Sequence, residues 1–165
     1  MNIEVPFLYF YLIKLNTMYN ALVHAHSGLR WVALGLLLFA IFNAAKKQTS
    51  GRYEKKDKMM NLFAMVFLHI QLLIGLGLFF MNDVSKVSFS EGWMKVPMFR
   101  FFGLEHILGM LLAIIIVTIG RKKAEKLTSS RDKHRKIMIF YTIGLILILA
   151  SIPWPFREAL GGKWM

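Results

Sequence analysis

The chain has 165 residues, of which 56% are hydrophobic, and it carries a net charge of +12 without any cysteine. The lack of cysteine excludes disulfides, thiolate metal sites and covalent c-type haem attachment. We expect no nucleic-acid partner, because 14 of the 21 Lys and Arg lie in two short segments between apolar stretches, 46–58 and 121–136, which is the positive-inside pattern of a membrane protein.

Before the first long apolar stretch, residues 1–17 contain a run of about nine apolar residues, which is too short to span a bilayer as a helix. Its aromatic residues suit the headgroup region. We expect this N-terminal extension to be interfacial, or to reflect a start assigned too early, with Met18 as the natural beginning.

Four apolar stretches follow, each about as long as a membrane-crossing helix needs to be. They cover residues 19–45, 59–81, 98–120 and 137–156. The sequence therefore predicts an all-α integral membrane domain, residues 18–165, folded as an up-down four-helix bundle. The positive-inside rule places the loops 46–58 and 121–136 in the cytoplasm and both termini outside.

Several polar side chains lie inside these stretches, where they are costly in hydrocarbon and indicate a functional site. Counted from the inner helix ends, Arg30 and Glu105 both lie about 22 Å up, which predicts an ion pair between the first and third helices. His106 lies at about 21 Å and His69 at about 15 Å, close enough to ligate one haem iron from opposite faces. His26, at about 28 Å, is the alternative partner of His106.

Other residues extend or compete with this hypothesis. Arg30, Arg100 and Lys95 are candidates to meet haem propionates. A zinc or copper site is a separate possibility, with imidazole and carboxylate ligands from His24, His26, Glu105 and His106. His134 lies among Lys and Arg in the loop 121–136, and we expect it on the surface near lipid headgroups.

The chain resembles a family of small bacterial four-helix membrane proteins labelled cytochrome b-like. The resemblance covers nearly everything from about Met18 to Arg157 and rests on four motifs: HSGLRW at 26–31, HIQLLIGL at 69–76, EH at 105–106 and IPWPF at 152–156. It implies His26, Arg30, His69, Glu105 and His106 as the polar set. The larger b561-type and copper-resistance-type cytochromes are a looser analogy. They hold two haems, and two are not expected here because the fourth helix lacks a histidine.

Two functions follow from the sequence as hypotheses. The first is a b-type cytochrome-like protein of the bacterial inner membrane, which binds one haem b in the outer half of the bundle and passes electrons between quinol and an external redox partner. The second is a haem-free accessory or scaffold subunit of a larger membrane complex. We therefore expect an electron carrier or an accessory subunit rather than a stand-alone enzyme. The sequence contains no nucleophile with a plausible base and no phosphate-binding glycine loop.

Overall fold

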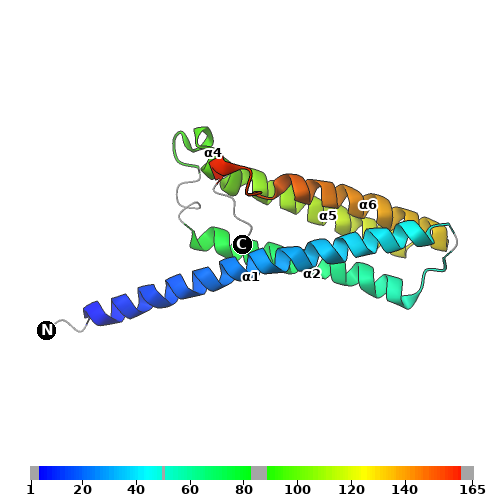
Figure 1. Ribbon diagram of the computed structural model, residues 1–165, viewed down its shortest axis with the longest axis horizontal. Coiled ribbons are helices and arrows are strands. Elements are labelled where there is room, and N and C mark those ends of the chain that lie inside the picture. The colour runs from blue at the N-terminus through cyan, green and yellow to red at the C-terminus, as the bar shows by residue number, and fades with distance from the viewer. Residues whose placement is uncertain (1–3, 50, 83–88, 161–165) are drawn as a thin grey trace.

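The computed structural model describes residues 4–49, 51–82 and 89–160, with side chains from residue 13 onward. Within these residues every regular element is helical, and four long helices run side by side (Figure 1). They are α1 (Glu4–Lys47), α2 (Lys55–Met81), α5 (His106–Glu125) and α6 (Ser130–Ser151). Short elements complete the fold: η1 (Trp93–Lys95), α4 (Pro97–Arg100), the π-helical turn η2 (Phe101–Glu105) and η3 (Glu158–Leu160).

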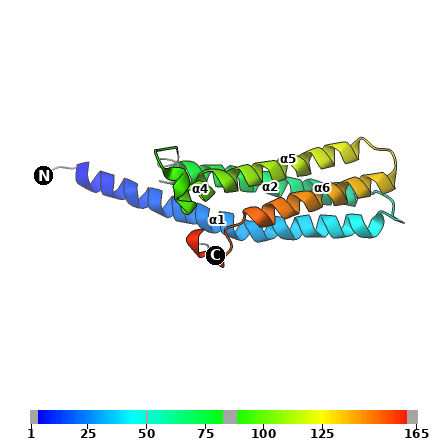
Figure 2. The same ribbon diagram turned by 90° about the horizontal axis from the view of Figure 1, so that it is seen from above.

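Each long helix packs against two of the others. Helix α1 packs against α2 and α6, and α5 packs against α6 and α2. Successive helices run in opposite directions, so both basic connections lie at one end of the bundle (Figure 1). The predicted up-down four-helix bundle is confirmed. The first part of α1 extends beyond the other helices (Figure 2). From Glu4 onward, the predicted N-terminal extension is therefore continuous with the first helix.

Four helical segments are long and apolar enough to cross a membrane: Ile13–Lys47, Lys55–Met81, Pro97–Glu125 and Ser130–Ser151. Large apolar side chains cover their outer faces, such as Phe42 at 67% exposure and Leu73 at 69%. A soluble monomer rarely exposes continuous apolar surface of this kind, whereas lipid tails would cover it. The fold is that of a multi-pass membrane protein.

Small residues set the close approach of α5 and α6. A Cβ added to Gly120 would overlap Phe140, one at Gly144 would overlap Val117, and one at Gly109 would overlap Ser151. Glycine at helix contacts lets two backbones pack closely in a membrane, where dispersion contacts rather than hydrophobic burial hold helices together. The α5–α6 pair is therefore the tight half of the bundle.

The fourth helix begins earlier than the apolar pattern predicts. Ser129 caps it by accepting a hydrogen bond from the Asp132 backbone N–H at 3.3 Å, so the basic run belongs to the first two turns of α6. The prediction that His134 is a surface loop residue is wrong. Its side chain is fully buried on the same face as Ile137 and Tyr141, and its ring packs edge-on against Tyr53 at 5.1 Å.

A buried polar cluster holds the basic-loop end of the bundle together. Asp57 is 1% exposed and accepts hydrogen bonds from Lys47 Nζ at 2.9 and 3.0 Å and from Asn43 Nδ2 at 2.9 Å. The Tyr53 hydroxyl donates to Glu125 Oε1 at 2.7 Å, and burial together with this bond raises the pKa of Tyr53. These contacts join α1, α2, α5 and the 48–54 connection, and the apolar pattern did not predict them.

Candidate functional site

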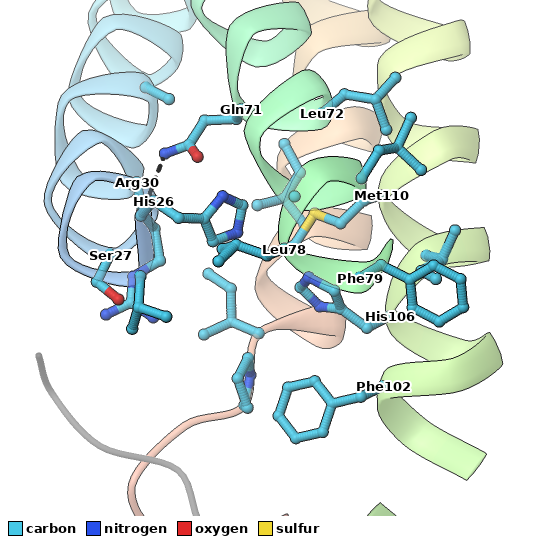
Figure 3. A pocket seen from close by; sticks show the side chains of 18 of the residues that line it. His26, Ser27, Arg30, Gln71, Leu72, Leu78, Phe79, Phe102, His106 and Met110 are labelled. Atoms are coloured by element: carbon cyan, nitrogen blue, oxygen red, sulfur yellow. Dashed lines mark hydrogen bonds between the residues drawn. The ribbon is translucent and has the colours of Figure 1, made fainter. Parts of the chain in front are cut away.

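A pocket of about 500 Å³ lies between the helices near the end opposite the basic connections. Its volume falls in the range of about 300–1,000 Å³ that small-molecule and cofactor sites occupy. Leu, Ile, Met and Phe side chains form most of the wall, and the polar side chains in it include His26, Ser27, Arg30, Gln71 and His106 (Figure 3). An apolar pocket with a few convergent polar groups is the default binding site of a protein.

One face of α1 supplies His26 and Arg30, which are four residues apart and therefore neighbours on the helix. Both side chains therefore reach the pocket from the same face of α1. Across from them, Gln71 of α2 donates from Nε2 to the backbone carbonyl of His26 at 3.0 Å, which ties α2 to α1 beside the pocket. The His26 ring packs on Gly75, where a Cβ would come within 3.2 Å of His26 Cε1.

His106 begins α5 directly after the π-helical turn, and its Nδ1 lies 2.7 Å from the carbonyl oxygen of Ser151 at the end of α6. A carbonyl only accepts hydrogen bonds, so Nδ1 carries the proton and Nε2 keeps its lone pair. Phe101 and Phe102 pack around the ring, with centroids 5.7 and 6.2 Å away. The imidazole is therefore fixed in both orientation and tautomer.

The IPWPF motif explains why the Ser151 carbonyl accepts from a side chain. Pro153 ends α6 at Ser151, and the last carbonyls of a helix have no N–H of the same helix to accept from. Pro153 itself has no N–H for the Leu149 carbonyl, and Trp154 Nε1 donates to that carbonyl at 2.8 Å. The end of the helix thus leaves acceptors for one pocket histidine and one tryptophan.

His26 and His106 face each other across the pocket (Figure 3). Their ring centroids are 6.5 Å apart, and the ring planes meet at 74°. A metal–imidazole bond is about 2 Å long, so two imidazoles bound to opposite sides of one metal ion have centroids about 6 Å apart. The two rings are therefore far enough apart for both to ligate one metal ion between them, and the alternative pair of the sequence analysis is the one that the structure brings together.

His69 does not take part in this arrangement. Its Nδ1 lies 2.8 Å from the Met65 carbonyl of its own helix, and α2 turns Leu68, Gln71 and Leu72 toward the pocket instead. The prediction that His69 faces His106 is wrong, because two residues at similar heights meet only if they also share the inward face of their helices. The spacing of Leu68, Gln71, Leu72 and Gly75 marks that face in the sequence.

The predicted ion pair between Arg30 and Glu105 is also wrong. Glu105 accepts from Arg100 Nε at 2.7 Å, both side chains are nearly half exposed, and Glu105 does not line the pocket. The two residues are five apart across the π-helical turn, where the i to i+5 spacing aligns side chains on one face. Arg30 does line the pocket, with its guanidinium 5.1 Å from the ring centroid of Trp31.

The alternative zinc or copper site is not formed. The described part of the chain includes His24, His26, Glu105 and His106, and it holds no group of three or more His, Cys, Asp or Glu side chains placed to bind a metal ion. His24 is exposed on another side of α1, and Glu105 points away to Arg100. The pocket thus brings two histidines together, His26 and His106, without a third such side chain from the described residues.

No protein-family model, curated protein or solved structure matches the chain. The cytochrome b-like resemblance of the sequence motifs therefore stays a prediction, and the geometry of the pocket has to carry the functional argument.

Proposed function

We propose that this protein is a membrane b-type cytochrome that binds one haem b between His26 and His106 and transfers electrons. The observation that carries the proposal is the facing pair of imidazoles, 6.5 Å apart across an apolar pocket of about 500 Å³. When bound, haem supplies a one-electron iron couple, and two histidine ligands leave no open iron position for oxygen chemistry.

The residues around the pair suit this role. The His106 Nδ1–H bond to a carbonyl orients the ring and raises the basicity of Nε2, as the outer-shell partners of metal-bound histidines commonly do. Gly75 leaves room for the His26 ring, whose Nδ1 has no hydrogen-bond partner among the described residues. The apolar wall excludes water, which would otherwise stabilise charge on the iron centre.

Arg30 is the residue placed to meet an acidic substituent of the ligand. It lies one turn below His26 on the same face of α1 and lines the pocket, where its guanidinium would bind a propionate through charge-assisted hydrogen bonds. Arg100 and Lys95, the other two candidates, do not line the pocket.

The charge pattern suggests how the protein sits in the bilayer. The positive-inside rule would put the two basic connections in the cytoplasm of a bacterial inner membrane, and the pocket would then lie in the outer half. A quinol within the bilayer and a redox partner outside it are the electron-transfer partners that this position favours. The bilayer itself would cover the exposed apolar faces.

The deciding experiment is the visible spectrum and haem content of protein purified in mild detergent from cells supplied with haem. We expect a sharp α band on dithionite reduction and one haem b per chain. A colourless preparation that also takes up no haem on titration would overturn the proposal. If stoichiometric partner subunits accompanied it, the scaffold function would replace the cytochrome.

Substitution of Gly75 gives a test with a built-in control. In Gly75→Val the new side chain meets the His26 ring, where a Cβ alone already comes within 3.2 Å, and should weaken haem binding about tenfold. Gly77→Val makes the same change two residues later, where nothing lies within 4 Å. Haem titration of both purified variants should separate them, and equal loss from both would contradict the placement of His26.

A further inference from the structure

Two lysines converge at the basic-loop end of the tight helix pair. Lys123 near the end of α5 and Lys136 near the start of α6 each place Nζ 5.8 Å from the ring centroid of Phe140. Neither lysine forms an ion pair with a carboxylate among the described residues. Two ammonium groups held against one aromatic ring repel each other, and a bound anion would relieve the repulsion.

A groove of about 280 Å³ lies at the start of α6, and Lys136 is part of its lining. Leu127, Asp132, Arg135, Lys136 and Ile139 line it. The groove has a charged end with Arg135 and Lys136 and an apolar end with Leu127 and Ile139. Asp132 is an acidic member, but it lies in the first turn of α6, where the helix N-terminus favours a carboxylate. The lining is therefore net positive and amphiphilic.

Exposed apolar stripes run along α5 and α6 toward the middle of the bundle, and the stripe of α6 begins at Ile139 in the groove. On α6 the stripe consists of Ile139, Ile143 and Ile146, exposed by 40, 44 and 61%. On α5 it consists of Ile119, Ile115 and Leu112, exposed by 40, 43 and 53%. Spacings of three and four residues keep each stripe on one face of its helix. Cations thus stand directly above a strip of surface that suits hydrocarbon chains.

We propose that Lys123, Lys136 and Arg135 bind the headgroup phosphate of an anionic phospholipid, whose acyl chains lie along the apolar stripes of α5 and α6. The phosphodiester would lie at the charged end of the groove, where Arg135 and Lys136 would donate charge-assisted hydrogen bonds and Lys123 would add positive charge. Basic pockets between membrane helices at the cytoplasmic surface are the usual sites for such headgroups. This site is separate from the histidine pocket and does not depend on haem.

The test compares lipid binding by the full chain and two charge-matched variants. Protein in detergent is incubated with an equimolar mixture of dioleoyl phosphatidylglycerol and dioleoyl phosphatidylcholine, and bound lipids are counted by native mass spectrometry. We expect selective retention of phosphatidylglycerol. The variant K123Q/K136Q should lose it about 20- to 30-fold, because each lysine near an anionic surface contributes about fivefold.

The control variant K46Q/K55Q removes two exposed lysines from the same end of the bundle, on α1 and α2, and should retain phosphatidylglycerol as the wild type does. Equal loss in both variants would overturn the proposal in favour of a diffuse surface charge. A separate titration with inorganic phosphate, followed by thermal unfolding in lipid-free detergent, checks the source of the phosphate. If inorganic phosphate alone stabilised the protein as much as phosphatidylglycerol does, the proposal would also be overturned, since a lipid site needs the acyl chains.

Discussion

Replacement of His106 or His26 by alanine should abolish stoichiometric haem binding, whereas replacement of His69 should leave it intact. His26 and His106 are the two imidazoles that face each other, with centroids 6.5 Å apart, and each would supply one ligand to the iron of the proposed haem. Loss of either histidine would remove one of these two bonds, and the alanine leaves a gap at the position of the ring. We expect haem content below about a tenth of the wild-type value, a loss of more than 1.4 kcal/mol in binding.

His69→Ala is the matched control, because it removes the same side chain from the same part of the bundle. The His69 ring lies outside the pocket and bonds to the carbonyl of its own helix, so its removal should leave the α band and the haem content unchanged. Circular dichroism and gel filtration of each variant check that the helices still fold. If His69→Ala lost its haem while His26→Ala kept it, the pair His69 and His106 would be reinstated and our assignment would be wrong.

Helix number and topology were predictable because membrane-crossing helices can be recognised in a sequence by their length and apolar composition. An apolar run near twenty residues is needed whatever the neighbouring helices do. Helix ends were less predictable, since lysine and arginine are good helix formers and extend the helices beyond the apolar runs. This is why α6 begins at Ser130 and buries His134.

The pairing of site residues was harder to predict, because height along a helix is only one of two coordinates. His69 lies at a height similar to that of His106, and Glu105 at the height of Arg30. Neither side chain points toward its predicted partner, because each lies on a different side of its helix. For His69, the inward face of α2 was available in the spacing of Leu68, Gln71 and Leu72. For Glu105, the π-helical turn changes the rotation locally, and no residue pattern in the sequence marks that turn.

One part of the site was encoded in the sequence but was missed. Proline ends a helix, and the carbonyls of the last turn then lack an N–H of the same helix, so Pro153 indicates an orphan acceptor at Ser151. That acceptor sets the tautomer of His106. The proline thus marks the end of α6 and also the carbonyls that a pocket side chain reaches.

The second large effect is expected at the opposite end of the bundle, where Asp57→Ala should destabilise the fold by about 3 kcal/mol. The Asp57 side chain is 2% exposed, and it accepts bonds from Lys47, from Asn43 and from the Glu54 backbone N–H. Removal of one partner of a buried ion pair leaves the other charge and its donors unsatisfied.

Equilibrium unfolding in mixed micelles, followed by tryptophan fluorescence, measures the change in the free energy of unfolding. Lys56→Gln is the control, one residue earlier in the first turn of α2, where the ion pair with Glu54 has side chains 75 and 49% exposed. Exposed pairs contribute little to stability, so this variant should unfold at the same denaturant concentration as the wild type. Haem content should survive in both variants, because neither residue lines the histidine pocket. If Asp57→Ala were as stable as Lys56→Gln, Lys47 and Asn43 would have found new hydrogen-bond partners, in water or at Glu54, with no loss of stability. The polar cluster would then not stabilise the basic-loop end of the bundle.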